Sequence, residues 1–390
     1  MVKKAKVLLV MSGLFTFAMG LSNVFVNIFL WKKSNDFIVI AQYNLMHYLF
    51  VPVTFILAGW IAKKKNGVWP LRIGIVLFAI FYICILILKA KVVKYVILIG
   101  ILYGIAGGFY WLAFQVLTFD LTSPENRDTF NGLNGTIASS CHSVAPFIAA
   151  FIIHKSEGIT GYSIVFGTSV TIFTVLVLIS ILLGSERYEK ELVFRKLLSN
   201  NSLSWAIIRK STAVWGMRDT VMMFLITVLI FKTTGSELAL GKLAFFSHLI
   251  LAATFAVEQK IIKPERRVIS IHVGAIFMFI AVIGLGINIS YLTVLIYIIV
   301  NAIFMPFFIV PMMSAGFNVI NKYHEEKMRI EYVINKEIAL NLGRAVSASV
   351  LILLLMFLDK PGSLNYFLVF IGGMQLISVY YLKKLDIWEG

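Results

Sequence analysis

Charged residues are scarce in this sequence of 390 residues, and their scarcity excludes most soluble folds. Asp, Glu, Lys and Arg make up 14% of the chain and hydrophobic residues 59%, whereas a soluble domain carries roughly 25% charged residues. A chain with so much apolar surface cannot hide it inside a water-soluble fold of this size. We therefore expect its solvent to be the hydrocarbon interior of a lipid bilayer.

Several other features are rare or missing. The two cysteines, Cys84 and Cys141, both lie in apolar stretches, so neither a disulfide framework nor a metal site is expected. Without a Walker sequence, a nucleophile elbow or a zinc-binding histidine pair, we expect neither an ATPase nor another enzyme, and no cofactor. Nucleic-acid binding is not expected either, because the cations behind the net charge of +16 stand in short clusters between apolar stretches.

Long apolar stretches dominate what is present. A membrane-spanning helix needs about 20 mostly apolar residues, and twelve stretches meet this requirement. They run near residues 6–30, 38–62, 70–89, 95–118, 130–153, 162–184, 205–231, 239–262, 268–288, 291–318, 333–358 and 364–382. The first is too long for a signal-peptide core, so we interpret it as a retained helix. The sequence predicts an all-α polytopic membrane protein, with twelve transmembrane helices in two pseudo-symmetric six-helix bundles.

The longest polar interruption divides the chain into halves. Residues 185–204 are charged and amphipathic, and we interpret them as a cytoplasmic linker between an N-terminal bundle (1–184) and a C-terminal bundle (205–390). Lys and Arg accumulate in cytoplasmic loops and so indicate orientation. With cytoplasmic termini, 23 of these cations lie at inner ends of the spans and eight at outer ends: Lys32, Lys33, Lys89, Lys91, Lys94, Lys155, Lys232 and Lys360. We expect a multi-pass monomer of the cell membrane with both termini cytoplasmic.

An internal repeat supports two halves. The chain reads LWKKSNDFIVIAQYNLMHYLF after the first span and IFKTTGSELALGKLAFFSHLI after the seventh. The matched pairs are Lys32 with Lys232, Asp36 with Glu237, and His47 with His248. A weaker similarity relates residues 20–23 (GLSN) of the first span to residues 216–219 (GMRD) of the seventh.

Two short patterns accompany this organisation. The loop after the second span reads GWIAKKKNG (residues 59–67), and the fifth span contains APFIAA (residues 145–150). With twelve spans, a charged central linker and a parallel repeat, the chain resembles the major facilitator superfamily. That resemblance implies a transporter whose gating loop contains Gly59, Lys63, Lys64 and Gly67. The family has an acid where this chain has Lys63, so its gating salt bridge cannot form in the usual way here.

The resemblance extends to direction and to a narrower branch. The fifth-span pattern is similar to one found in the family's exporters, which favours export. The stretches LWKKSNDFIVIAQYNL and KEIALNLGR (residues 336–344) resemble an uncharacterised bacterial branch of the superfamily. This branch implies the fold without implying a substrate.

Ionisable residues inside the spans are the first candidates for function, because each costs at least about 2.5 kcal/mol at the bilayer centre on insertion scales. Arg218 and Asp219 lie midway along the seventh span, while Glu337, Asn341 and Arg344 share one face of the eleventh. We expect the four charged residues to gather around one polar cavity that binds an anionic substrate group and a proton. The alternatives are a structural ion pair and a lining of the cytoplasmic helix end.

Two further groups complete the candidates. Tyr110, Trp111 and Gln115 of the fourth span can form an aromatic wall with one amide. His47 and His248 can relay protons, because histidine titrates near neutral pH. For both groups, a role in helix packing is the alternative.

The sequence thus predicts a secondary active transporter that moves a small organic solute, anionic or amphiphilic, by alternating access. Proton-coupled export, as by an antiporter, is the favoured form. Two alternatives stay open: a lipid or lipid-linked precursor translocase on the same fold, and a non-transporting membrane receptor or immunity protein. The expected partners are the bilayer, a small-molecule or lipid-like substrate, and protons.

Overall fold

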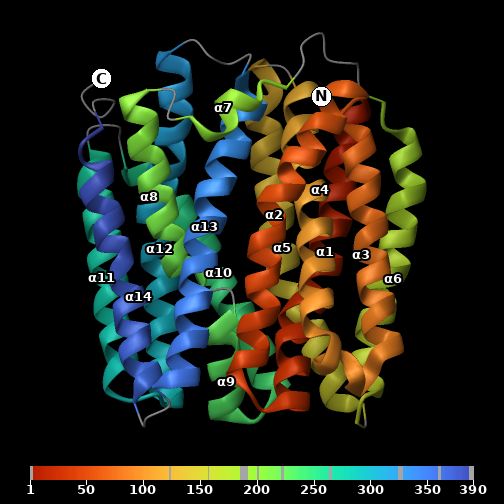
Figure 1. The fold of residues 1–390 in the computed structure, drawn as a ribbon, viewed down its shortest axis with the longest axis vertical. Helices are drawn as coiled ribbons and strands as arrows, with labels where there is room; N and C mark the ends of the chain where they lie inside the picture. Colours follow the sequence, from red (N-terminus) through yellow and green to blue (C-terminus); the bar gives the residue numbers. More distant parts are fainter. Residues whose placement is uncertain are drawn as a thin grey trace. The chain divides into compact units, whose positions relative to one another are not determined.

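The computed structural model describes residues 3–122, 124–156, 158–184, 192–199, 202–220, 224–262, 266–323, 328–358 and 362–385. The first half contains α1 (Lys3–Ser34), α2 (Phe37–Lys64), α3 (Val68–Leu88), η1 (Lys89–Tyr95), α4 (Val96–Asp120), α5 (Pro124–Lys155), α6 (Thr160–Ile179) and η2 (Ser180–Leu182). The second half contains α7 (Phe194–Leu198), α8 (Leu203–Thr220), α9 (Ile226–Thr234), α10 (Glu237–Ile261), α11 (Arg267–Ile287), α12 (Tyr291–Lys322), α13 (Arg329–Phe357) and α14 (Ser363–Leu382) (Figure 1).

Eleven helices in the described part of the chain are long and apolar enough to cross a membrane. The seventh predicted span is carried by two helices, α8 and α9, with Phe224 and Leu225 in a π-helical turn before α9. Residues 221–223, which complete that span, lie outside the described residues. With α8 and α9 counted as one span, the prediction of a twelve-helix, all-α membrane protein in two six-helix bundles is confirmed.

The helices form two compact units. Unit 1 comprises Met1–Val193 and Ser236–Phe245, and unit 2 comprises Phe194–Gly235 and Phe246–Gly390. The boundary passes through α10, whose first turns belong to unit 1. The finer division into bundles 1–184 and 205–390 with a linker at 185–204 stays a prediction, and residues 185–191 of that linker lie outside the described part.

The two units repeat the same packing. In unit 1, α1 packs against α5 and α6, while α3 packs against α4 and α6. In unit 2, α8 packs against α13 and α14, while α11 packs against α12 and α14. The first and third helices of each half therefore have equivalent neighbours, as a pseudo-symmetric repeat predicts.

Glycines mark equivalent positions in the two units. A Cβ atom on Gly20 of α1 would lie 2.9 Å from the Cβ of Ala145 in α5. A Cβ atom on Gly216 of α8 would lie 2.2 Å from the Leu340 carbonyl oxygen in α13. In both units the first helix thus needs a glycine where it meets the fifth. The similarity between residues 20–23 and 216–219 is a similarity of position as well as of sequence.

The geometry at the starts of α2 and α10 changes one of the matched residue pairs in the internal repeat. Asn35 (φ 50°) and Gly235 (φ 65°) both adopt the left-handed conformation just after a helix. The next residues cap the following helices, because Asp36 accepts a hydrogen bond from the Ile38 N–H at 2.7 Å and Ser236 accepts one from the Ala239 N–H at 3.2 Å. Backbone geometry therefore pairs Asp36 with Ser236 and not with Glu237, the residue matched by charge.

Glu237 instead fastens the start of α10 within unit 1. Its Oε1 atom accepts hydrogen bonds from Lys32 Nζ at 2.7 Å and from the Tyr162 hydroxyl at 2.8 Å. Four residues later, a Cβ atom on Gly241 would lie 2.4 Å from the Cβ of Ala150 in α5. In a bilayer the hydrophobic effect does not drive helices together, because lipid tails are as apolar as the side chains. Close packing of small residues is therefore one of the interactions that hold helices together there.

A buried asparagine fastens the short helix α7 within unit 2. Asn335 of α13 is fully buried, and its Nδ2 donates to the carbonyl oxygens of Lys196 (3.2 Å), Leu197 (2.7 Å) and Ser199 (3.0 Å). Its Oδ1 accepts a hydrogen bond from Trp205 Nε1 at 2.9 Å. One side chain thus satisfies carbonyls at the end of α7, which would otherwise lack partners.

Candidate functional site

Helices α8 and α13 cross at two glycines in unit 2. A Cβ atom on Gly343 would lie 1.8 Å from a carbonyl oxygen of α8, and one on Gly216 would lie 2.2 Å from a carbonyl oxygen of α13. The backbones therefore touch at a distance that no larger residue permits. Arg344 follows Gly343 directly, and Asp219 lies three residues beyond Gly216, so the crossing brings these two side chains together.

Asp219 and Arg344 form an ion pair at this crossing. Arg344 Nε donates to Asp219 Oδ2 at 2.8 Å, and Arg344 Nη2 donates to the same oxygen. The side chains are 17% exposed for Arg344 and 14% for Asp219. Both residues lie near the middle of their spans, where an unpaired charge is costly.

The ion pair continues along α13. Arg344 Nη1 donates to Asn341 Oδ1 at 3.4 Å, and Asn341 Nδ2 donates to Glu337 Oε2 at 3.2 Å. The same Nδ2 also donates to the Glu337 carbonyl oxygen at 2.9 Å. The polar face of α13 is therefore one network that joins two carboxylates through an amide and a guanidinium.

Arg218 lies in a second cluster. Its side chain is 1% exposed, and its guanidinium lies 4.9 Å from the Trp215 ring centroid. Its Nη2 donates to Asn301 Oδ1 and approaches the Tyr297 hydroxyl at 3.3 Å and the sulfur of Met278 at 3.5 Å. Arg218 thus faces α11 and α12, whereas Asp219 faces α13, because adjacent helical residues point about 100° apart.

Arg218 has no counter-charge among the residues that the structure describes. Its contacts are an amide, a phenol, a thioether and an indole, and none of them carries a negative charge. Its Nε and Nη1 atoms are buried without a hydrogen-bond partner. A guanidinium does not lose its proton in a protein. The second cluster therefore holds a buried and uncompensated positive charge.

Of the four charged residues predicted to share a cavity, the structure joins Asp219, Arg344 and Glu337 in one network. Arg218 and Asp219 are consecutive residues of α8, so the two clusters begin from neighbouring positions on that helix. A single cavity that includes both clusters stays a prediction.

Sequence reasoning missed the residues that surround Arg218. Trp215 precedes it by three positions and therefore shares its helix face. Tyr297 and Asn301 stand four apart on the apolar helix α12, and this spacing is the signal that could have identified them. What the sequence does not contain is the information that this face of α12 meets the Arg218 face of α8.

The fourth-span candidates divide into exposed and buried residues of unit 1. Trp111 is 44% exposed, and Gln115 is exposed one turn later. Tyr110 is 2% exposed and stacks parallel to Phe15, with ring centroids 3.3 Å apart. Trp111 and Gln115 therefore lie on the surface of unit 1, whereas Tyr110 packs in its interior, and a wall formed by all three stays a prediction.

The histidine candidates lie in different units. His47 packs beside the rings of Tyr48 and Tyr103, with centroid distances of 5.1 and 4.5 Å. The Tyr103 hydroxyl in turn donates to Asn23 Oδ1 at 2.7 Å. His248 is half-buried in the unit 2 part of α10. Their role as a proton relay stays a prediction.

The gating-loop candidates lie at the end of α2 and the start of α3. Gly59 and Lys63 are buried, and the Lys64 ammonium group lies 4.9 Å from the Trp60 ring centroid. Gly67 precedes α3, where an added Cβ atom would lie 3.1 Å from Leu117. The loop is thus packed against α4 within unit 1.

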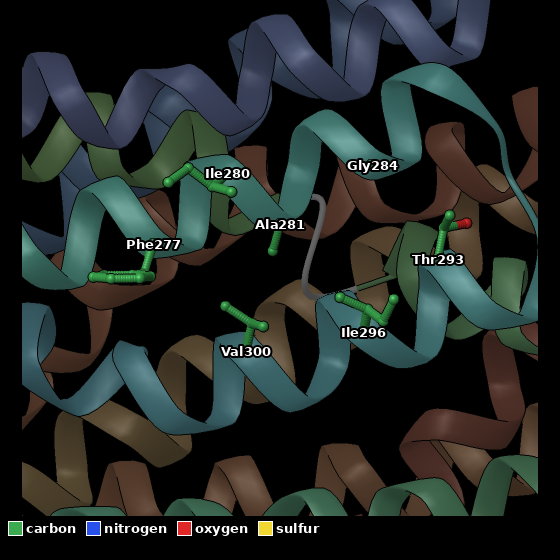
Figure 2. A pocket seen from close by; sticks show the side chains of 7 residues that line it. All are labelled: Phe277, Ile280, Ala281, Gly284, Thr293, Ile296 and Val300. Atoms are coloured by element: carbon green, nitrogen blue, oxygen red, sulfur yellow. The ribbon is translucent and has the colours of Figure 1, made fainter.

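A cavity of about 170 Å³ lies between α11 and α12, and neither Arg218 nor a residue of the Asp219–Arg344 network lines it. Figure 2 shows its lining residues on the facing sides of the two helices: Phe277, Ile280, Ala281, Gly284, Thr293, Ile296 and Val300. The Thr293 hydroxyl already donates to the Asn288 carbonyl oxygen at 2.7 Å. The cavity therefore suits an apolar chain better than a polar solute.

Comparison with known proteins agrees with this architecture. The family model described as Major Facilitator Superfamily matches residues 8–329. The chain belongs to the major facilitator superfamily. It is accordingly a multi-pass membrane protein of the transporter kind and not an enzyme, as the sequence predicts. A relative from Bacillus subtilis (strain 168), named uncharacterized protein YqgE, is 34% identical over 385 residues, which cover 98% of this chain and 90% of the relative.

Solved structures show the same fold. The D-xylose-proton symporter superposes with a TM-score of 0.72 at 13% identity, covering 99% of this chain and 98% of the symporter. The human organic anion transporter MFSD10 (TETRAN) superposes with a TM-score of 0.64 at 14% identity, covering 97% of this chain and 98% of that protein. Similarity at such identities shows the fold of this superfamily member and no more.

Proposed function

We propose that the protein is a proton-coupled secondary transporter that moves a small organic solute across the cell membrane by alternating access. The observation that supports this most strongly is the Asp219–Arg344 ion pair at the glycine crossing of α8 and α13. A carboxylate held by one guanidinium in the middle of a span can bind a proton and release its partner. Such a proton-sensitive contact between two helices is what coupling requires.

The network provides a destination for the released arginine. Once Asp219 is protonated, the Arg344 charge needs another anion within the membrane. Glu337 lies on the same face of α13 and is already connected through Asn341. We infer that Arg344 exchanges Asp219 for Glu337 as the proton arrives, which loosens the crossing between α8 and α13. Departure of the proton reverses the exchange.

Direction and orientation complete the proposal. Export is favoured by the APFIAA pattern of α5, whose Ala145 and Ala150 contact Gly20 and Gly241. Both termini are proposed to be cytoplasmic, because the cations concentrate on that side of the predicted spans. The protein is proposed to act as a monomer. The similar symporter and organic anion transporter indicate that this fold can support proton coupling and organic anions.

The lipid-translocase alternative draws on one observation. The cavity between α11 and α12 is apolar, and Phe277, Ile280 and Ile296 beside it are exposed, so it can hold part of a lipid chain. Its lining lacks a charged group that would hold a headgroup. The charged network therefore favours a solute over a lipid.

The test uses purified protein in sealed liposomes containing a pH-sensitive dye, to which a panel of organic acids, sugars and nucleosides is added. We expect at least one solute to evoke proton movement with wild-type protein and none to do so with Asp219→Asn. Asp36→Asn is the matched control, because Asp36 is an exposed helix cap and Asn caps equally well. Solute movement that is equally fast in Asp219→Asn and without a pH gradient would contradict proton coupling.

A further inference from the structure

Arg218 takes no part in the coupling network of Asp219, Arg344, Asn341 and Glu337. Its side chain makes no hydrogen bond or ion pair with Asp219 or Glu337, and its partners Asn301, Tyr297 and Trp215 are uncharged. Such partners fix the position of a guanidinium without cancelling its charge. The neighbouring Arg344 shows what a neutralised arginine looks like in the same unit, because it donates two hydrogen bonds to one carboxylate oxygen.

The unused donors of Arg218 define a ligand chemistry. Nε carries one N–H group and Nη1 carries two, and both atoms are buried without an acceptor. Burying a charge in this way is costly unless an anion shares the site for part of the time. A neutral acceptor would satisfy the hydrogen bonds and leave the charge uncompensated. Only an anion satisfies both.

We propose that Arg218 binds the anionic group of the transported solute, and that this solute is an organic anion with a single negative charge, of the carboxylate type. The proposal rests on the proposed transport function and specifies its substrate class. The single charge follows from the Arg218 cluster itself, which holds one guanidinium and, among its described contacts, no negative group. A dianion would leave one negative charge unmatched beside Arg218.

The burial of Arg218 is consistent with a site that encloses its anion during transport. At 1% exposure, the guanidinium is closed off on every side in this state. An anion reaches it only when the surrounding helices separate, and it is enclosed when they close. Within that enclosed site a charge-assisted hydrogen bond is stronger than in water. Trp215 and Asn301 keep the guanidinium in place while the site is open.

The experiment measures binding to the purified full-length protein by thermal unfolding, with no pH gradient. The probes are acetate, benzoate and octanoate, with benzamide as the neutral counterpart of benzoate and phenyl phosphate as its dianionic counterpart, each up to about 50 mM. At least one carboxylate should stabilise the wild type saturably. Benzamide should bind about tenfold to a hundredfold more weakly than benzoate, as expected for a hydrogen bond to a charged group. Failure of all three carboxylates, or equal binding of benzoate and benzamide, overturns the proposal.

Variants assign the effect to one residue. Arg218→Gln should abolish stabilisation by the carboxylate, whereas Arg72→Gln should leave it unchanged. Arg72 is the matched control because it lies in unit 1 and bonds to Ser180, with Nε at 3.2 Å from the hydroxyl and Nη2 at 3.0 Å from the carbonyl oxygen. Should Arg218→Gln not fold, Arg218→Lys keeps the charge but loses the planar donor group. It should weaken carboxylate binding several-fold, and wild-type affinity in this variant would overturn the proposal.

This result is separable from the test of proton coupling. If carboxylate binding depends on Arg218 but Asp219→Asn keeps wild-type proton coupling, the coupling scheme is refuted and the anion site is not. Proton-driven movement of a neutral solute, with no carboxylate binding, would preserve the transport function and refute the anionic substrate class.

Discussion

Replacing Gly343 by alanine tests the part of the structure on which the site depends. The new Cβ atom would lie 1.8 Å from the Ala213 carbonyl oxygen, while real Cβ atoms essentially never approach closer than 3.0 Å. The difference, 3.0 − 1.8, requires α8 and α13 to separate locally by at least about 1.2 Å. Both clashing groups are backbone or Cβ atoms, so no side-chain rotation can relieve the contact.

The separation has two consequences of known size. Overpacking of this kind typically costs about 1–3 kcal/mol of stability. A displacement of 1.2 Å along the Arg344 Nε to Asp219 Oδ2 bond of 2.8 Å would lengthen it to about 4.0 Å, which is no longer a hydrogen bond. We therefore expect Gly343→Ala to lose both thermal stability and proton coupling.

The assay compares Gly343→Ala with Gly284→Ala in the same unit, by thermal unfolding in detergent and by proton movement in liposomes. Nothing lies within 4 Å of a Cβ atom added to Gly284. That variant should therefore be as stable as the wild type or slightly more stable, because alanine lowers the conformational entropy of the unfolded chain. Wild-type stability and coupling in Gly343→Ala would show that the crossing is not tight and would refute the reasoning.

Two further predictions concern contacts outside the network. Glu237→Gln weakens the bonds from Lys32 and Tyr162 and should lower the stability of unit 1 by about 1 kcal/mol, since Lys32 is 40% exposed. Thermal unfolding of this variant beside Asp36→Asn measures the effect, and identical curves would contradict it. Asn335→Ala leaves several buried groups without partners, each costing about 1–3 kcal/mol. Limited trypsin digestion should cleave after the basic residues of α7 faster than in wild type, and unchanged cleavage would show that Asn335 does not hold that helix.

The spans were predictable because hydrocarbon imposes a length and a composition on every helix that crosses it. The same reasoning identified Glu337, Asn341 and Arg344 as one face of a helix, since this face follows from spacing alone. It could not tell which helix that face meets. The separation of Arg218 from Asp219 illustrates the limit, because their partners, on α12 and α13, come from different parts of the chain.

The repeat shows a second limit. Matching by charge pairs Asp36 with Glu237, whereas backbone geometry pairs Asp36 with Ser236 as helix caps. Capping depends on the φ and ψ angles of a residue, and the sequence does not display these angles. The glycines at the α8–α13 crossing were similarly visible in the sequence, but their function becomes clear only from the backbone that faces them.

Coupling of protons to solute movement by Asp219 is tested most directly by one comparison. Once a carboxylate substrate is identified by the binding assay, its exchange across liposomes at equal pH is compared with its accumulation driven by a pH gradient. We predict that Asp219→Asn retains exchange, because Arg218 still binds the anion, but loses accumulation. Accumulation by Asp219→Asn to the wild-type level would contradict the claim.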